Sequence, residues 1–90
     1  MAEIRVAMIQ NELGLHARAA AQFVQTANKF RAEITVSKDG EEVNGKSILK
    51  LMMLAVPIGS EILLKADGED ALEMLESLVR LIDNKFGEPK

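Results

Sequence analysis

Hydrophobic and polar positions along the chain repeat with two different periods. Alternation with a period of two predicts four strands, at residues 3–9, 32–37, 41–43 and 61–65. Apolar residues at helical spacing predict three helices, at about residues 17–30, 47–54 and 71–86. The predicted order of elements is therefore β-α-β-β-α-β-α.

The predicted strands have one apolar and one polar face. The clearest case is the second strand, in which Ala32, Ile34 and Val36 alternate with polar residues. Sheets with one face in contact with water are typically antiparallel. We therefore predict an α+β fold, an open-faced β-sandwich with a four-stranded antiparallel sheet and three helices on one face.

Local signals refine the ends of these elements. Asp39-Gly40 predicts a tight hairpin turn between the second and third strands. The acids in residues 67–70 favour the start of the last helix. Residues 87–90 follow that helix without an apolar pattern and are expected to be a frayed tail.

Two apolar stripes carry further expectations about burial. The first strand places three apolar side chains on one face: Ile4, Val6 and Met8. The last helix has the clearest helical stripe in the chain: Ala71, Leu72, Leu75, Val79, Ile82 and Phe86.

Composition excludes several classes of protein. The 90 residues suit one domain, 1–90, and they contain no cysteine and a single histidine, which excludes disulfides and argues against thiolate or histidine-rich metal sites. A net charge of −3 without Trp or Tyr makes a nucleic-acid partner unfavourable.

Neither a signal peptide nor a membrane-spanning segment is expected. The first residues lack a basic region followed by a long apolar run. The longest apolar stretch, 48–58, is interrupted by Lys50 and Pro57 and is too short to cross a bilayer. A cytoplasmic location is the expectation.

The stretch Gly14-Leu15-His16-Ala17-Arg18-Ala19 places the only histidine where a loop becomes a helix. A neutral imidazole is a good nucleophile near pH 7, and a helix N-terminus attracts anions through its unpaired N–H groups and dipole. Arg18 adds a forked cationic donor suited to phosphate oxygens. One interpretation is therefore a phosphoryl carrier at His16, and the other is that His16 only caps the helix while Arg18 is a solvated charge.

This stretch and the segment Asn44-Gly45-Lys46-Ser47-Ile48 together closely resemble HPr, the histidine-containing phosphocarrier family of the phosphoenolpyruvate-dependent sugar phosphotransferase system. The resemblance implies the same fold and a carrier that accepts a phosphoryl group from phosphorylated enzyme I. It would pass the group to enzyme IIA-type acceptors, with no cofactor or metal, and the partner proteins would complete the transfer, so that the chain is not itself an enzyme.

The family places the phosphoryl group on the Nδ1 atom of the matching histidine, here His16. Arg18 and the backbone N–H groups of Ala17 and Arg18 would stabilise it. A monomer is the expected state of a carrier that meets several partners in turn.

Ser47 has two interpretations. It is well placed as the N-cap of the short helix at 47–54, which is worth roughly 1 kcal/mol. The HPr resemblance implies instead a regulatory site for a serine kinase and phosphorylase, and a phosphate at a helix N-terminus permits both roles.

The short helix carries more apolar side chains than one buried face requires. If Leu51 and Leu54 point inward, then Ile48, Leu49 and Met52 are left exposed, and Met53 with them. Exposed apolar clusters mark partner surfaces, although a small core can also absorb such residues. The resemblance implies docking of phosphoryl donors and acceptors here.

One residue departs from the family pattern, which usually has proline where this chain has Ala19. Alanine keeps the backbone N–H and helix propensity, so phosphoryl transfer is expected to survive with an altered rate or phosphohistidine lifetime. The alternative function is a regulatory binding module of the same family, nitrogen-related or in catabolite control, in which His16 is idle.

Overall fold

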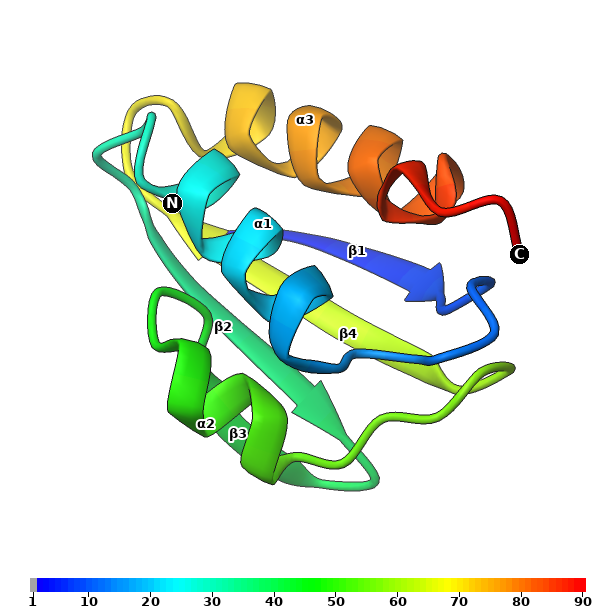
Figure 1. Ribbon diagram of the computed structural model, residues 1–90. Helices are drawn as coiled ribbons and strands as arrows, with labels where there is room; N and C mark the ends of the chain where they lie inside the picture. Colours follow the sequence, from blue (N-terminus) through cyan, green and yellow to red (C-terminus); the bar gives the residue numbers. More distant parts are fainter. Residues whose placement is uncertain (1) are drawn as a thin grey trace.

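A computed structural model describes residues 2–90 and shows a four-stranded antiparallel sheet with helices on one face (Figure 1). In chain order the elements are β1 (Ala2–Met8), α1 (Ala17–Ala27), β2 (Glu33–Lys38), β3 (Glu41–Asn44), α2 (Ile48–Met53), β4 (Glu61–Asp67) and α3 (Ala71–Asp83). A short 3₁₀ segment, η1 (Lys85–Gly87), follows. The strand order is β1-β4-β2-β3, and every neighbouring pair is antiparallel. The predicted open-faced sandwich is confirmed.

The hairpin between β2 and β3 forms as its sequence predicts. Asp39 and Gly40 both have positive φ, 53° and 87°, which is the geometry of a two-residue hairpin turn whose twist matches that of the strands. The first helix ends at Ala27 rather than Phe30, because turns closed by Thr26 and Ala27 follow it.

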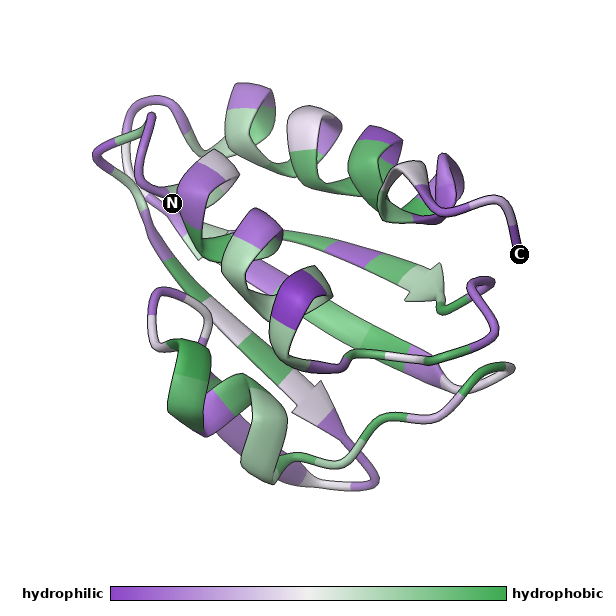
Figure 2. Cartoon of the chain, in the orientation of Figure 1, coloured by the Kyte–Doolittle hydropathy of each residue, from purple (hydrophilic) through white to green (hydrophobic). Residues whose placement is uncertain are grey.

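The core is built from buried apolar side chains of the sheet and of the helices. Figure 2 shows that hydrophobic residues occur on both layers. The stripe predicted for the last helix needs one correction, since Leu72 is exposed whereas Met74 and Leu78 are buried. Phe86 is buried as expected, but it belongs to η1 and has a φ of 55°, outside α3. None of the helices within residues 2–90 combines the length and apolarity needed to cross a membrane.

The open face of the sheet carries the apolar stripe of β1. Ile4, Val6 and Met8 are all about half exposed, while the alternate positions Ala7 and Ile9 are buried. The pairing with β4 decides which of the two alternating sets of β1 side chains is buried, because Ala7 lies opposite the buried Ile62. The alternation predicted the strand correctly but could not show which of its faces is covered.

Asp70 directly precedes α3, which begins where the acidic turn predicts the start of a helix. It is the N-cap residue of α3 but makes no side-chain capping bond. Its carboxylate instead accepts hydrogen bonds from the backbone N–H groups of Arg31, at 2.9 Å, and Ala32, at 2.8 Å. These bonds tie the turn before β2 to the start of α3, and the bond from Arg31 is the main reason why the pKa of Asp70 lies below its ordinary range.

Replacing Asp70 with asparagine is expected to weaken the acid dependence of stability. Because the folded-state pKa is depressed, the unfolded chain binds more protons, so this contribution to stability is present above the unfolded pKa and is lost as pH falls. Urea unfolding between roughly pH 5 and pH 2 should therefore show a flatter decline for Asp70→Asn than for the wild type.

Asp39→Asn is the matched control, because Asp39 is largely exposed and its only ion pair, within the described chain, is a long one with Lys38. Equal slopes for the wild type and Asp70→Asn would contradict the role assigned to the carboxylate.

Candidate functional site

His16 is the N-cap residue of α1, and its backbone is extended, with φ −80° and ψ −178°. The Nδ1 atom of its ring accepts a hydrogen bond from the backbone N–H of Arg18, at 3.3 Å. His16 therefore caps α1, and this cap is compatible with either interpretation of the residue. The same geometry places Nδ1 at the N-terminus of the helix, where anions are favoured.

Gly14 sets the direction in which the chain enters α1. Its φ is +68°, and a Cβ atom built there would lie 2.4 Å from the carbonyl oxygen of Val56. The neighbouring Leu15 donates its backbone N–H to that same oxygen at 2.9 Å. Only glycine permits both the backbone conformation and the close approach, which holds His16 against the segment after α2.

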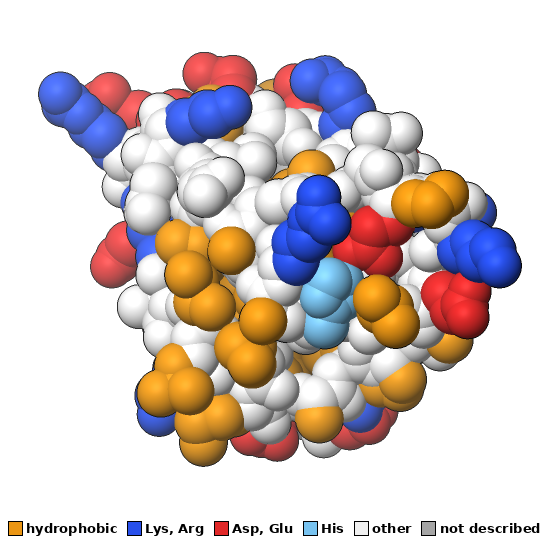
Figure 3. All heavy atoms as spheres, viewed as in Figure 1, with side chains coloured by type: hydrophobic (Ala, Val, Ile, Leu, Met, Phe, Trp, Pro, Cys, Tyr) orange, Lys and Arg blue, Asp and Glu red, His pale blue; other side chains and the backbone are white. Residues whose placement is uncertain are grey.

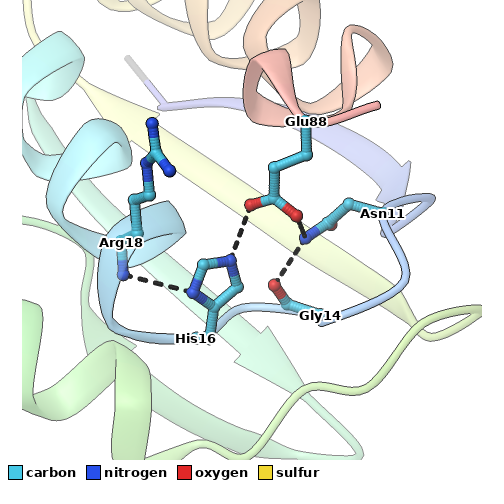
Figure 4. Close-up of polar contacts among 5 residues, drawn as sticks. All are labelled: Asn11, Gly14, His16, Arg18 and Glu88. Carbon is cyan, nitrogen blue, oxygen red and sulfur yellow. Dashed lines mark hydrogen bonds and ion pairs between the residues drawn. The ribbon is translucent and has the colours of Figure 1, made fainter. Parts of the chain in front are cut away.

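The other ring nitrogen of His16 contacts a residue that sequence reasoning missed. Nε2 lies 2.6 Å from Oε2 of Glu88, which is 72 positions further along the chain (Figure 4). The prediction of a frayed tail at residues 87–90 is wrong. Phe86 is buried just before Glu88, and the carbonyl of Lys90 accepts the backbone N–H of Glu12 at 2.8 Å. The only sequence signal for this anchoring is the apolar Phe86.

Asn11 contacts the same carboxylate as His16. Its side chain is fully buried, and its Nδ2 group donates to the carbonyl of Gly14 at 2.7 Å and to Oε1 of Glu88 at 3.1 Å. Figure 4 shows the amide lying between these two acceptors, with the His16 ring on the other carboxylate oxygen. Asn11 thereby joins the loop before α1 to the segment after α3.

The carboxylate of Glu88 is held in its charged form. Partial burial opposes ionisation, but hydrogen bonds from His16 and Asn11 outweigh it, and the pKa of Glu88 lies below its ordinary value. The positive charge of Arg18 contributes a smaller part in the same direction. The ring of His16 is thus flanked by a backbone N–H at Nδ1 and an anion at Nε2.

The structure places the other predicted residues of this stretch around the ring. Ala17 and Arg18 are the first two residues of α1, where backbone N–H groups have no carbonyl acceptor within the helix, and the Arg18 N–H is taken up by the His16 ring. The Arg18 side chain is exposed, and within residues 2–90 its guanidinium forms no hydrogen bond or ion pair. A shallow hollow beside the ring is lined by Glu12, Leu13, His16, Arg18, Glu88, Pro89 and Lys90.

Ser47 and the apolar residues after it lie on α2, which packs against α1. Ser47 is the N-cap of α2, and its Oγ accepts the backbone N–H of Lys50 at 3.2 Å, so the capping interpretation is confirmed. Leu51 and Leu54 are buried, which meets the condition on which the predicted exposure of the other apolar side chains rests. The remaining apolar side chains form an exposed cluster, the α2 patch: Ile48, Leu49, Met52 and Met53. Figure 3 shows hydrophobic side chains gathered over α2 and beside the single histidine.

Comparison with known proteins gives consistent matches over nearly the whole chain. Residues 4–84 match the family described as "PTS HPr component phosphorylation site". The phosphocarrier protein HPr of Neisseria meningitidis is 51% identical over 80 residues, which cover 89% of this chain and 90% of that protein.

Solved structures agree with these matches. A crystal structure of HPr from Thermoanaerobacter tengcongensis aligns with a TM-score of 0.94 at 48% identity, covering 98% of this chain and 99% of that one. The HPr-like protein Crh of Bacillus subtilis is 47% identical over 77 residues. A structure of the Crh dimer aligns with a TM-score of 0.71 and covers 86% of this chain and 91% of that one.

Proposed function

This chain belongs to the HPr family, and we propose that it is a phosphocarrier that accepts a phosphoryl group on Nδ1 of His16. The donor is phosphorylated enzyme I, and the acceptors are proteins of the enzyme IIA type. The observation that supports this most directly is the orientation of the ring, because Nε2 is engaged by Glu88 while Nδ1 faces the N-terminus of α1. The cytoplasm, where these partners act, is the proposed location.

Phosphoryl acceptance needs no loss of a proton from the chain. The lone pair of Nδ1 attacks the phosphorus of the donor phosphohistidine, a P–N bond forms on His16, and the P–N bond of the donor breaks. The phosphoryl oxygens then take the backbone N–H groups of Ala17 and Arg18 as donors, in place of the bond that Nδ1 now accepts from Arg18. The exposed guanidinium of Arg18 is free to turn toward the same oxygens.

Partner proteins complete the transition state. Phosphoryl transfer depends mainly on positioning and on stabilising charge, and this chain supplies a nucleophile and an anion site without a second reacting group. We propose that partners dock on the α2 patch, with Ile48, Leu49 and Met52 as the central contacts, because this exposed apolar cluster lies on the helix that packs against α1. Residues 1–90 would act as one domain, of which Met1 lies outside the described part.

The test is incubation with enzyme I and phosphoenolpyruvate, followed by intact mass and ³¹P NMR. We expect one acid-labile phosphoryl group whose chemical shift identifies the Nδ1 phosphoramidate. Failure to take up a label from an enzyme I preparation that charges another HPr would contradict the proposal.

A second candidate function is a regulatory binding module. The match to Crh favours it, since that protein is described as the catabolite repression HPr of Bacillus subtilis. Such a module would use the same α2 patch and leave His16 idle. The structures of Crh dimers also make self-association a property to measure by sedimentation, whichever function holds.

We further propose that phosphorylation of Ser47 regulates docking on the α2 patch. Ser47→Asp is expected to keep the fold, because aspartate also caps helices. It should slow phosphoryl acceptance by roughly 3- to 10-fold, because a partner that docks on the apolar α2 patch must remove water from the new charge beside it. The measurement is the rate of labelling by phosphorylated enzyme I.

Ser47→Asn is the matched control, because asparagine caps a helix equally well without adding charge. Equal labelling rates for the aspartate and asparagine proteins would remove the main support for regulation at this position.

A further inference from the structure

We infer that Glu88 is a positioning residue that keeps a proton on Nε2 of His16 while the phosphoryl group is gained and lost at Nδ1. This inference rests on the proposed function, and it assigns a role to a residue far from the histidine motif in the sequence. The evidence is the geometry around the Glu88 carboxylate, in which each oxygen has a different partner.

The carboxylate is fixed from several sides. Oε1 accepts the Nδ2 group of Asn11 at 3.1 Å, which leaves Oε2 directed at Nε2 of His16 at 2.6 Å. The side chain of Glu88 is only 12% exposed and that of His16 is 26% exposed, so water competes weakly for this bond. The backbone bond from Glu12 to Lys90 holds the segment in place.

A carboxylate in this position must accept its hydrogen bond from the ring. The backbone N–H of Arg18 occupies the lone pair of Nδ1, so the ring proton resides on Nε2 and is donated to Glu88. Nδ1 is thereby left as the unprotonated nucleophile. A hydrogen bond from the imidazole to a buried carboxylate fixes the histidine tautomer in the same way in Ser-His-Asp catalytic triads.

The carboxylate also compensates the charge that develops during acceptance. When Nδ1 forms its bond to phosphorus and the Nε2 proton stays in place, the ring becomes a phosphorylated imidazolium with a positive charge. Glu88 lies 2.6 Å from that charge, and a hydrogen bond of this kind strengthens when its donor becomes cationic.

Donation reverses these changes. As the P–N bond breaks, its electron pair remains on Nδ1 and the ring leaves as neutral imidazole, with the Nε2 proton still donated to Glu88. Without that proton the leaving group would be imidazolate, a far stronger base and a poorer leaving group. Glu88 thus keeps phosphorylated His16 in the form that transfers its phosphoryl group.

The first experiment compares Glu88→Gln with the wild type in labelling by phosphorylated enzyme I. We expect the maximal rate to fall by about 10- to 100-fold, because glutamine carries no charge and offers one acceptor oxygen where both oxygens of Glu88 accept. The KM for enzyme I should change by less than about twofold. Glu12→Gln is the control, since Glu12 lies beside the same hollow and its side chain makes no hydrogen bond to His16 within residues 2–90. A Glu88→Gln protein that behaves like the control, or that changes only in KM, would overturn the inference.

The second experiment does not depend on enzyme I. Phosphoramidate, a small-molecule phosphoryl donor, charges the histidine chemically, and the hydrolysis rate of the product is followed against pH. Within residues 2–90, the other charged groups that line the hollow beside the ring are Arg18, Glu12 and Lys90. The wild type and Glu88→Gln retain all of them, and Glu12→Gln lacks only the Glu12 charge.

We expect hydrolysis of the Glu88→Gln protein to decline at a lower pH than in the wild type, by about one pH unit, because its ring loses the Nε2 proton more easily. The Glu12→Gln protein should follow the wild type. Identical profiles for all three would overturn the role of Glu88, whereas a wild type that phosphoramidate charges but enzyme I does not would overturn the proposed carrier function alone.

Discussion

Replacing His16 with alanine is expected to abolish phosphoryl acceptance, by at least roughly 1,000-fold, while the chain remains folded. Among residues 2–90, the ring nitrogen Nδ1 is the nucleophile that the geometry places at the N-terminus of α1, and the alanine side chain has none to replace it. The structural cost is small by comparison. Loss of the N-cap acceptor costs about 1 kcal/mol, against about 5–15 kcal/mol for the stability of a typical domain. Intact mass after incubation with enzyme I measures the first effect, and urea unfolding measures the second.

His16→Asn separates the two roles of the residue. Asparagine is among the best N-cap residues but forms no phosphohistidine, so this variant should be as inert as His16→Ala and more stable. A label that persists in both variants would contradict the assignment. Sensitivity of that label to hydroxylamine would then point to an acyl phosphate on a carboxylate, with Glu88 as the nearest one.

Replacing Gly14 with alanine is expected to destabilise the protein by about 2–5 kcal/mol. Two costs combine at this position. A φ of +68° is unfavourable for any residue with a Cβ, by about 1–2 kcal/mol, and that Cβ would lie 2.4 Å from the carbonyl oxygen of Val56. Relief of the clash requires the loop to move away from Val56, which would break the bond donated by Leu15 and displace His16. Urea unfolding gives the stability, and the labelling rate reports the displacement.

Gly59 offers a matched control for the steric part. Its φ is +86°, close to that of Gly14, but a Cβ there would meet nothing within 4 Å. Gly59→Ala should therefore cost only the backbone term, about 1–2 kcal/mol. If the Gly14→Ala protein were as stable as the Gly59→Ala protein, a clash between the new Cβ and Val56 would not contribute to the free energy of unfolding.

Elements defined by local pattern were predictable from the chain. The turn at Asp39-Gly40 depends on two adjacent residues, and Ser47 caps α2 through a backbone N–H three residues away. The burial of Leu51 and Leu54 follows from helical spacing within one short helix. In each case the decisive residues are neighbours in sequence, so the pattern contains the interaction.

The sequence did not predict contacts that join distant segments. Asp70 directly precedes α3, as the acidic turn predicts, but its carboxylate also binds the turn at residues 31–32. Leu72 fits the helical stripe of α3, yet the docking of that helix on the sheet buries Met74 and leaves Leu72 exposed. Propensity and charge describe what a segment favours alone, and packing selects among the compatible partners.

The sequence by itself determined the order of the elements, the open-faced arrangement and the position of His16 at the start of a helix, because each depends on periodicity or on a short motif. Only the tertiary structure decided which face of β1 is covered and which groups surround the histidine ring. Glu88 reaches His16 across 72 positions, and Asn11 supports it through a buried amide. Such contacts depend on how the segment before α1 packs against the segment after α3. No local sequence pattern can show a contact between residues that far apart in the chain.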